Sequence, residues 1–275
     1  MKSIAYDAVY NQIMAQMEKG DIPWKKSWKE SLPYNGKSGH RYNGINFFIL
    51  SLAGYADPRW YTYKQATELG GTVKKGEKSR QIVYWNFLTK EVDGKKKSIP
   101  LLKYFNVFNH QQIDGLKEEE KKVIELLDAE KIIEAYKDKP EIKHGFNYAA
   151  YQKASDLVKM PNKDMFDEVS EYYSTLFHEL GHSTGHEKRL NRKSLTETEL
   201  FGSETYSEEE LIAEYLSAFL CAEAGIDNTI ENSAAYIKGW MKCFKDNPEM
   251  IVHAASKAQK AADYILGRNA VPDPA

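Results

Sequence analysis

The stretch FHELGHSTGH, residues 177–186, places two histidines and a glutamate where they can hold and use a metal ion. His178 and His182 are four residues apart, so on a helix they lie on one face, one turn apart. Two imidazoles in this arrangement can bind one Zn²⁺, and Glu179 can activate a water molecule at that ion. The sequence therefore predicts one zinc ion per chain, with another divalent metal as the alternative, and Glu179 as the catalytic residue.

A catalytic zinc site needs a third protein ligand and one position left open. The extended motif H-E-x-x-H-x-x-G-x-x-H fails here, because Lys188 occupies its last position. His186 follows His182 by one turn and is interpreted as a surface histidine near the end of the helix. The next long helical run, YSEEELIAEYLSAFL at 206–220, offers glutamates instead.

Two glutamates of this run, Glu210 and Glu214, are four residues apart and share one helical face. We assign Glu210 as the third ligand and expect Glu214 to orient a ligating histidine through the ring N–H that the metal does not use. Glu209 and Glu214 remain alternatives as the ligand. Ser207 with Glu210 also forms S-x-x-E, which is typical of a capping box at the start of a helix.

The elements that position these residues indicate an α+β protein of 275 residues. Short β-branched or aromatic runs predict strands at 81–88 and 101–109, which form a hairpin, and two more within 144–161. Helical spacing predicts helices at 3–19, 58–70, 114–139, 164–185, 207–224 and, as a pair, within 230–266.

Charge divides the chain into a basic and an acidic part. Residues 1–110 carry 18 Lys and Arg against 9 Asp and Glu, whereas residues 111–275 carry 20 against 31. Charge alone leaves two interpretations open: two parts with different partners, of which a nucleic acid would prefer the basic one, or charge that only keeps the surface soluble. We therefore predict a small α+β N-terminal domain at 1–114, a charged helical linker at 115–140, and a mainly helical domain with a short antiparallel sheet at 141–275.

Basic and aromatic residues are interleaved in the N-terminal part, as in a surface that binds single strands. Stacking on bases is assigned to four aromatic residues, namely Tyr42, Trp60, Tyr61 and Trp85. Phosphate contacts are assigned to six basic residues, namely Arg41, Lys64, Lys74, Lys75, Lys78 and Arg80. Strand and helix spacing can also bury the aromatic residues in a core, so the choice between these two roles stays open.

Membrane and secreted proteins are disfavoured. The longest apolar run, at 45–56, is interrupted by Asn46 and Ser51 and is too short to span a bilayer. The N-terminus has no apolar region typical of a secretory signal. Cys221 and Cys243 are the only cysteines, which is too few for a disulfide framework. We therefore expect a cytoplasmic protein with no membrane partner.

Several segments together resemble the plasmid-borne ArdC-type antirestriction proteins and their mobile-element relatives. They are MFDEVSEYYSTLFHELGHSTGHEKRLNR, YSEEELIAEYLSAFL, YNGKSGHRYNGIN, PRWYTYKQATELGGTVKKGEKSRQIVYW, YFNVFNHQQIDG and AAYQKASDLVKMP. The resemblance covers most of the chain in the correct order. It implies an N-terminal domain that binds single-stranded DNA, joined to a C-terminal zincin-like metallopeptidase domain of the glutamate-ligand type. The glutamate pair also resembles the E-x-x-x-D arrangement of gluzincins, with Glu214 in place of the aspartate.

The resemblance implies that the function is that of an antirestriction-type protein of mobile elements. The resemblance implies that it binds single-stranded DNA, and the histidine motif predicts a zinc-dependent peptidase site for an unknown protein or peptide. Glu179 would take a proton from the attacking water and pass it to the leaving amine. Two alternatives remain: a DNA-protecting protein whose metal site is structural or vestigial, and a regulatory metallopeptidase that does not bind DNA.

Overall fold

The computed structural model describes residues 4–24, 32–92, 95–117, 128–196, 204–229 and 234–268. Within these ranges it describes only the backbone of residues 4–5, 85–92, 95–102, 196 and 204–206.

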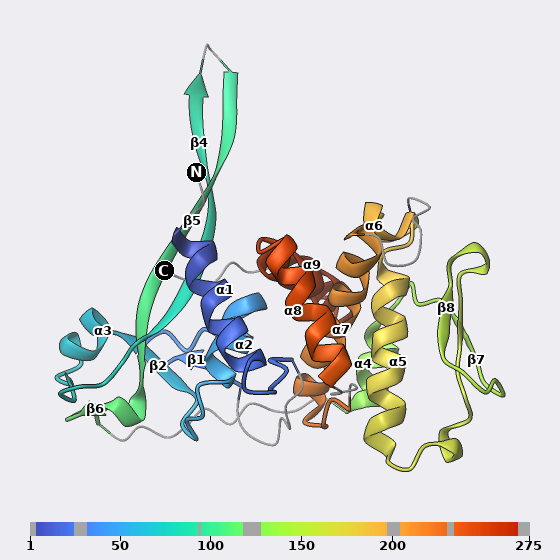
Figure 1. The fold of residues 1–275 in the computed structure, drawn as a ribbon, viewed down its shortest axis with the longest axis horizontal. Helices are drawn as coiled ribbons and strands as arrows, with labels where there is room; N and C mark the ends of the chain where they lie inside the picture. The colour runs from blue at the N-terminus through green and yellow to red at the C-terminus, as the bar shows by residue number, and fades with distance from the viewer. Residues whose placement is uncertain are drawn as a thin grey trace. The chain divides into compact units, whose positions relative to one another are not determined.

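The chain forms two compact units. The first consists of residues 1–15, 30–124 and 271–275, and the second of residues 16–29 and 125–270. The fold class expected from the sequence is confirmed, since a small α+β unit is accompanied by a mainly helical one (Figure 1). The exact domain bounds proposed from the sequence stay a prediction.

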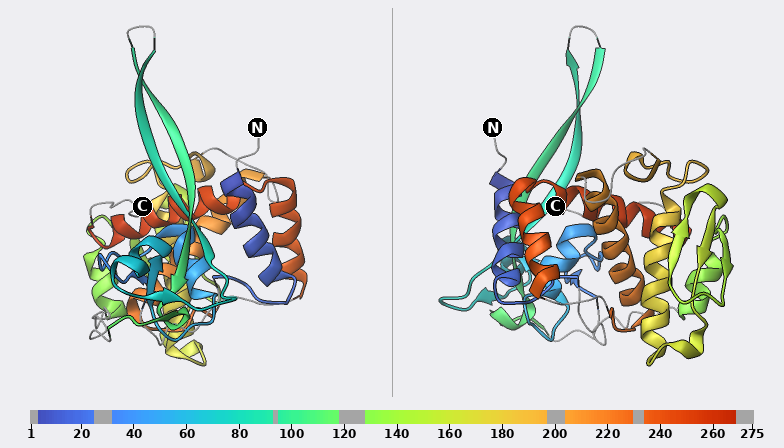
Figure 2. Two further views of the ribbon diagram at one scale, coloured as in Figure 1. Left: turned by 90° about the vertical axis from the view of Figure 1, so that its left-hand side faces the viewer. Right: turned by 45° about the vertical axis from the view of Figure 1, so that its right-hand side comes forward.

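The first unit combines helices with two small sheets. In chain order its elements are α1 (Ile4–Met17), β1 (Tyr34–Asn35), α2 (Gly44–Ser51), β2 (Arg59–Thr62), α3 (Tyr63–Glu68), β3 (Thr72–Val73), β4 (Arg80–Val92), β5 (Lys95–Asn109), the 3-10 helix His110–Gln112 and β6 (Ile113–Asp114). One sheet has the order β1-β2-β5-β4, with β1 parallel to β2 and the other pairs antiparallel. In the second sheet β3 pairs antiparallel with β6. The predicted hairpin is confirmed as the long ribbon of β4 and β5 in Figure 2.

The helix predicted at 58–70 is only partly correct. Arg59–Thr62 is a strand that pairs with β5, and the helix begins at the next residue. A capping box fixes this start, because the Thr62 hydroxyl accepts a hydrogen bond from the Gln65 N–H while the Gln65 side chain accepts one from the Thr62 N–H. Pairing with β5 therefore outweighs helical spacing over the first four residues.

Side-chain amides from two helices cover the outer edge of β4. Asn46 of α2 donates to the Val83 carbonyl at 2.7 Å and accepts from the Val83 N–H at 2.8 Å. Gln12 of α1 donates to the Gln81 carbonyl at 3.1 Å. Backbone groups on an edge strand are a template for pairing with other chains, so these bonds stabilise the sheet and protect its edge.

The second unit is mainly helical. Its elements are α4 (Ala129–Ala135), β7 (Glu141–Lys143), β8 (Ala150–Gln152), β9 (Leu157–Lys159), α5 (Val169–Thr184), α6 (Lys193–Thr196), α7 (Glu204–Ala224), α8 (Ala234–Asp246) and α9 (Met250–Ile265), with 3-10 turns at Lys153–Ser155 and Lys163–Met165. The sheet has the order β7-β9-β8, in which β7 is parallel and β8 antiparallel to β9. The sheet is therefore short, as expected, but mixed. α5 lies between it and helices α7 and α9 (Figures 1 and 2).

Small residues allow α5 and α7 to approach closely. Gly181 of α5 faces Ala213 of α7, and a Cβ added to Gly181 would lie 3.1 Å from the Ala213 Cα. Leu180 and Leu216, beside this crossing, are fully buried. The close approach brings the histidine motif of α5 beside the acidic first turns of α7.

The long charged helix predicted at 114–139 is present only in part. Ala129–Ala135 is helical, with Ile132 fully buried, while residues 118–127 lie outside the described part of the chain. No helix within the described ranges has both the length and the apolar character needed to cross a membrane.

Candidate metal centre

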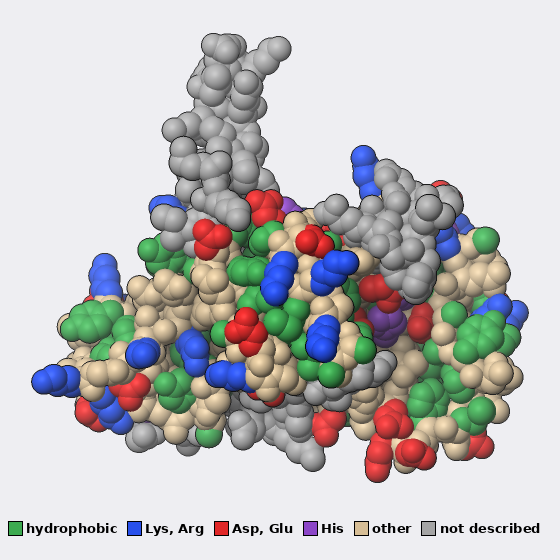
Figure 3. All heavy atoms as spheres, in the orientation of Figure 1, with side chains coloured by type: hydrophobic (Ala, Val, Ile, Leu, Met, Phe, Trp, Pro, Cys, Tyr) green, Lys and Arg blue, Asp and Glu red, His purple; other side chains and the backbone are tan. Residues whose placement is uncertain are grey.

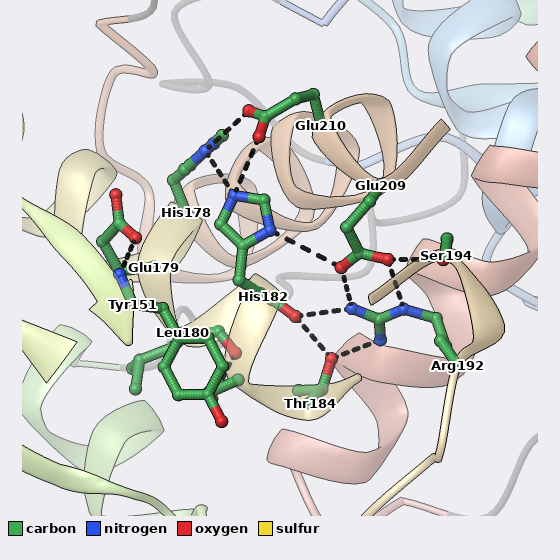
Figure 4. Close-up of polar contacts among 12 residues, drawn as sticks. Tyr151, His178, Glu179, Leu180, His182, Thr184, Arg192, Ser194, Glu209 and Glu210 are labelled. Atoms are coloured by element: carbon green, nitrogen blue, oxygen red, sulfur yellow. Dashed lines mark hydrogen bonds and ion pairs between the residues drawn. The ribbon is translucent and has the colours of Figure 1, made fainter. Parts of the chain in front are cut away.

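Three donor groups from two helices converge in the second unit. His178 and His182, one turn apart on α5, bring their Nε2 atoms to 3.0 Å from each other. Glu210 of α7 places Oε2 at 3.5 Å from His178 Nε2 and Oε1 at 3.6 Å from His182 Nε2. Figure 4 shows the three side chains pointing toward one another. In Figure 3, histidine atoms lie in a hollow beside acidic side chains.

The spacing of these donors fits a metal ion. In a tetrahedral site with bonds of about 2.0–2.1 Å, ligand atoms lie about 3.3–3.4 Å apart. The separations of 3.0, 3.5 and 3.6 Å bracket that value. Two imidazole nitrogens and a carboxylate oxygen are also ligands that zinc and other first-row divalent ions accept. The geometry and chemistry of the donors therefore suit one divalent ion.

Acidic neighbours favour a cation at this position. Burial lowers the pKa of His178, but the hydrogen bond to Glu210 and the charges of Glu214 and Glu179 outweigh burial and raise that pKa to about 9. A divalent ion would replace the proton that these carboxylates stabilise on the imidazole.

Glu179 faces the sheet from the same helix. The residue is 9% exposed, and its carboxylate accepts a 2.6 Å hydrogen bond from the backbone N–H of Tyr151 in β8. Because β8 is an edge strand, this N–H is available to α5 (Figure 4). The bond holds the Glu179 carboxylate in one orientation beside the helix turn that carries the two histidines.

The carboxylate beside the second ring nitrogen of His182 belongs to Glu209. Glu209 places Oε1 at 3.5 Å from His182 Nδ1. Glu214 instead accepts a 2.6 Å hydrogen bond from the Tyr236 hydroxyl, and burial raises the pKa of Glu214. Glu209 therefore takes the orienting position at His182, whereas Glu214 lies near enough to His178 for its charge to help raise the pKa of that imidazole. The orienting role expected for Glu214 at a ligating histidine stays a prediction.

His186 is a correction, because it is buried and not at the surface. It is 7% exposed, and its Nδ1 accepts a 3.2 Å hydrogen bond from the Lys188 N–H. The chain folds back after α5, where the Leu190 N–H donates to the Thr184 carbonyl at 3.0 Å and the Asn191 N–H donates to the His186 carbonyl at 3.0 Å. His186 is not one of the three converging donors.

Three of the four aromatic residues assigned to base stacking lie in the core of the first unit. Tyr42, Trp60 and Tyr61 are 3%, 1% and 5% exposed. Trp60 packs edge-to-face against Tyr55 at 5.5 Å between ring centroids, and Tyr61 packs in a buried cluster with Ala66 and Ile113. Rings packed in this way cannot stack on a base, which corrects their assignment. Trp85 lies in β4, but its side chain is outside the described part of the structure.

The basic residues assigned to phosphate contacts are more accessible. Lys64 has an 87% exposed side chain and lies 3.8 Å from Glu68, while Lys74 lies 3.6 Å from Asp114. Lys75 and Lys78 are also exposed, whereas Arg41 and Arg80 are half-buried. Their contact with phosphate stays a prediction.

Comparison with known proteins agrees with this architecture. A family model described as a zincin-like metallopeptidase matches residues 128–257, and a model of the N-terminal domain of the anti-restriction factor ArdC matches residues 3–108. The metal-free crystal structure of the antirestriction protein ArdC from plasmid R388 is 36% identical, with a TM-score of 0.78 over 94% of this chain and 96% of that one. The chain belongs to the ArdC family of antirestriction proteins. The Mn(II)-bound crystal structure of the R388 protein is 35% identical, with a TM-score of 0.79 over 97% of this chain and 98% of that one.

The chain also resembles parts of longer proteins. Two Escherichia coli proteins named DNA primase TraC are 37% and 35% identical over 97% and 95% of this chain. The chain spans only 27% and 20% of their lengths. A Sinorhizobium fredii protein named uncharacterized protein y4eC is 32% identical over 94% of this chain and 91% of its own length. The same two-part sequence thus occurs in proteins of very different length.

Proposed function

We propose that this chain is a metal-dependent peptidase whose ion is held by His178, His182 and Glu210. The observation that carries the proposal is the convergence of these donors beside Glu179, in a unit matched by a zincin-like metallopeptidase model. When bound, a divalent ion supplies Lewis acidity, which polarises the scissile carbonyl and acidifies water. Zinc is the expected ion, and manganese is the alternative because the R388 relative was solved with Mn(II).

The side chains then move the proton. Glu179 takes a proton from the attacking water and passes it to the leaving amine. The 2.6 Å bond from the Tyr151 N–H keeps the carboxylate oriented for both steps. β8 is an edge strand, to which an extended peptide can add as a further strand. Because Glu179 accepts from the Tyr151 N–H, the peptide would pair with the other backbone groups of that edge. A substrate held there would lie alongside the base.

The test is Glu179→Gln, which keeps the size of the side chain but removes the basic carboxylate. Cleavage of an unbiased peptide library should fall by about 10²–10⁴-fold, because general-base catalysis contributes that much. Metal content should remain at one ion per chain. Glu187→Gln, which changes an exposed glutamate just beyond the same helix, serves as the matched control and should cleave normally. If Glu179→Gln cleaves at the wild-type rate, Glu179 is not the base. If the metal-loaded wild type cleaves nothing, the structural-metal alternative replaces the peptidase.

We also propose that the first unit binds single-stranded DNA, through aromatic residues other than those first assigned. Tyr104, Asn106 and Phe108 occupy alternate positions of β5 and therefore share a face of the strand. Tyr63 packs edge-to-face against Phe108 at 6.4 Å between ring centroids. Tyr63 and Tyr104 are 62% and 41% exposed. Exposed rings beside positive charge are how proteins bind single strands without sequence preference.

An exposed lysine adjoins Tyr63, since Lys64 follows it in α3, whereas the exposed Lys103 lies next to Tyr104 in β5 but on the other face of the strand. Tyr63→Ala and Tyr104→Ala should each weaken binding of a mixed-sequence oligonucleotide by about 1–3 kcal/mol, the contribution of one stacked base. Fluorescence anisotropy measures this. Tyr148→Ala removes a tyrosine that is 49% exposed in the second unit and should leave affinity unchanged.

An antirestriction role follows from both activities, as protection of incoming single strands from host nucleases. If the wild type does not bind single strands at low salt, the DNA-binding proposal fails and the regulatory peptidase remains. If it binds but neither tyrosine variant is weaker, DNA binding stands and this stacking surface is wrong.

A further inference from the structure

The His182 imidazole is held from both sides. Its Nε2 points toward His178 and Glu210, whereas its Nδ1 lies 3.5 Å from Glu209 Oε1. Figure 4 shows Glu209 on the opposite side of the ring from Glu210, although the two glutamates are consecutive on α7. A carboxylate at Nδ1 favours the tautomer with a proton on that nitrogen, which leaves the Nε2 lone pair for a metal.

Glu209 is itself fixed by three donors. Arg192 donates from Nε to Oε2 at 3.1 Å and from Nη2 to Oε1 at 2.5 Å, and Ser194 donates from Oγ to Oε2 at 2.6 Å. Glu209, Arg192 and Ser194 are 4%, 8% and 8% exposed. A fork of two parallel bonds from an arginine gives a carboxylate one defined plane. The carboxylate therefore has little freedom to rotate away from His182.

Arg192 is in turn bound to the end of α5, the helix that carries both histidines. Its Nη1 donates to Thr184 Oγ1 at 2.6 Å, and its Nη2 donates to the Gly181 carbonyl at 2.9 Å. Its own N–H donates to the Gly185 carbonyl at 3.0 Å. A Cβ on Gly185 would lie 2.8 Å from Nη2, so glycine at this position leaves room for the guanidinium.

We propose that Glu209 and Arg192 are positioning residues of the metal centre, with Arg192 acting through Glu209 on His182. The proposal rests on the proposed function only in requiring that the site binds a metal. Removing a group that orients a metal-ligating histidine typically lowers metal affinity by about 10–100-fold. The competing interpretation is a buried ion pair that only stabilises the contact between α7 and the turn after α5.

The experiment compares two neighbouring glutamates in the full chain. Glu209→Gln keeps the shape of the side chain but loses the charged acceptor. Glu208→Gln is the matched control, because Glu208 lies one position earlier on the same helix and pairs with Lys257 at 2.7 Å. Affinities for Zn²⁺ and Mn²⁺ are measured by competition with a chromogenic chelator, and thermal unfolding of the metal-free protein is measured in parallel.

We expect Glu209→Gln to lose about 10–100-fold in metal affinity, while Glu208→Gln stays within about threefold of the wild type. The visible absorption of the Co²⁺-loaded protein, which reports ligand geometry, should change only in Glu209→Gln. Arg192→Lys keeps the charge but not the fork. It should weaken metal binding on its own and cause no further loss when combined with Glu209→Gln, because both act along one path. If Glu209→Gln unfolds, Ser194→Ala takes its place and should weaken metal binding more than Glu208→Gln does.

Metal affinity equal to that of the wild type in Glu209→Gln, with a lower melting temperature in the metal-free state, would overturn the proposal and leave a structural ion pair. If the losses of metal affinity in Arg192→Lys and Glu209→Gln add up in the double variant, Arg192 does not act through Glu209. A wild type that binds metal but cleaves no peptide would refute the peptidase and leave the positioning role intact.

Discussion

Gly181 offers a test of how helix packing sets the metal site. In Gly181→Ala the new methyl group would meet the Ala213 Cα at 3.1 Å, below ordinary contact distances of 3.4–4 Å. A backbone atom cannot rotate away, so α5 and α7 must separate by a few tenths of an ångström. Overpacking of this kind typically costs about 1–3 kcal/mol. The gain in helix propensity from glycine to alanine offsets about 0.8–1.0 kcal/mol of that cost.

Gly239→Ala is the matched control, because Gly239 lies inside α8 and an added Cβ has no atom within 4 Å. It should show the propensity gain alone and raise the melting temperature. The two variants should therefore differ by about 1–3 kcal/mol, the overpacking cost itself. At this chain length each kcal/mol shifts the melting temperature by about 2–4 °C, which calorimetry resolves readily.

The same separation should move the histidines of α5 away from Glu210 on α7, so Gly181→Ala should also bind Zn²⁺ more weakly than Gly239→Ala. Chelator competition measures this difference. The reasoning is refuted if Gly181→Ala stabilises the protein as much as Gly239→Ala and binds metal like the wild type.

Three further predictions concern pH and salt. The pKa of His178 is raised to about 9 in the metal-free protein, so below that pH a metal ion must displace a proton from His178. The affinity for Mn²⁺ should therefore rise by up to about tenfold per pH unit and level off near pH 9. An affinity that stays constant from pH 6 to 9 would contradict this. Burial opposes ionisation of Glu209, but His182 and Arg192 lower its pKa to about 2. The stability that the ionised carboxylate contributes is therefore complete above pH 4.5 and is lost as the pH falls toward 2. In Glu209→Gln, the free energy of unfolding should lack this loss between pH 4.5 and 2. Lys75→Gln should reduce the log–log salt slope of single-strand binding by about 0.7 if Lys75 contacts one phosphate, and an unchanged slope would exclude that contact.

The metal-binding face could be predicted because a helix converts four-residue spacing directly into proximity. His178 and His182 are adjacent in space for that reason alone, and Glu210 on the next long helix completes the group. The role of Glu209 could not be predicted in the same way. Its partners Arg192 and Ser194 are 17 and 15 residues away along the chain and reach it only because the segment after α5 folds back.

The exposure of the aromatic residues in the first unit could not be predicted from the sequence, for a different reason. Helical spacing predicted a helix that includes Arg59–Thr62, but this segment pairs with β5 and β1 and is an inner strand of the sheet. Trp60 and Tyr61 are buried by groups that pack on the two faces of this strand, while Tyr63, at the start of the following helix, is exposed. The short strands β1, β3 and β6 have two residues each, too few to show any period in the sequence. The groups that pack on each face of the sheet, and not residue type, decide which rings are accessible.

The central claim is a metal centre built from His178, His182 and Glu210, and calorimetric titration of the metal-free protein with Zn²⁺ and Mn²⁺ tests it most directly. The wild type should bind one ion per chain, and Glu210→Gln should lose measurable binding. Glu214→Gln should retain one ion per chain, because the carboxylate of Glu214 is bonded to Tyr236 and is not among the three converging donors. Wild-type binding by Glu210→Gln, together with loss of the ion in Glu214→Gln, would contradict the account.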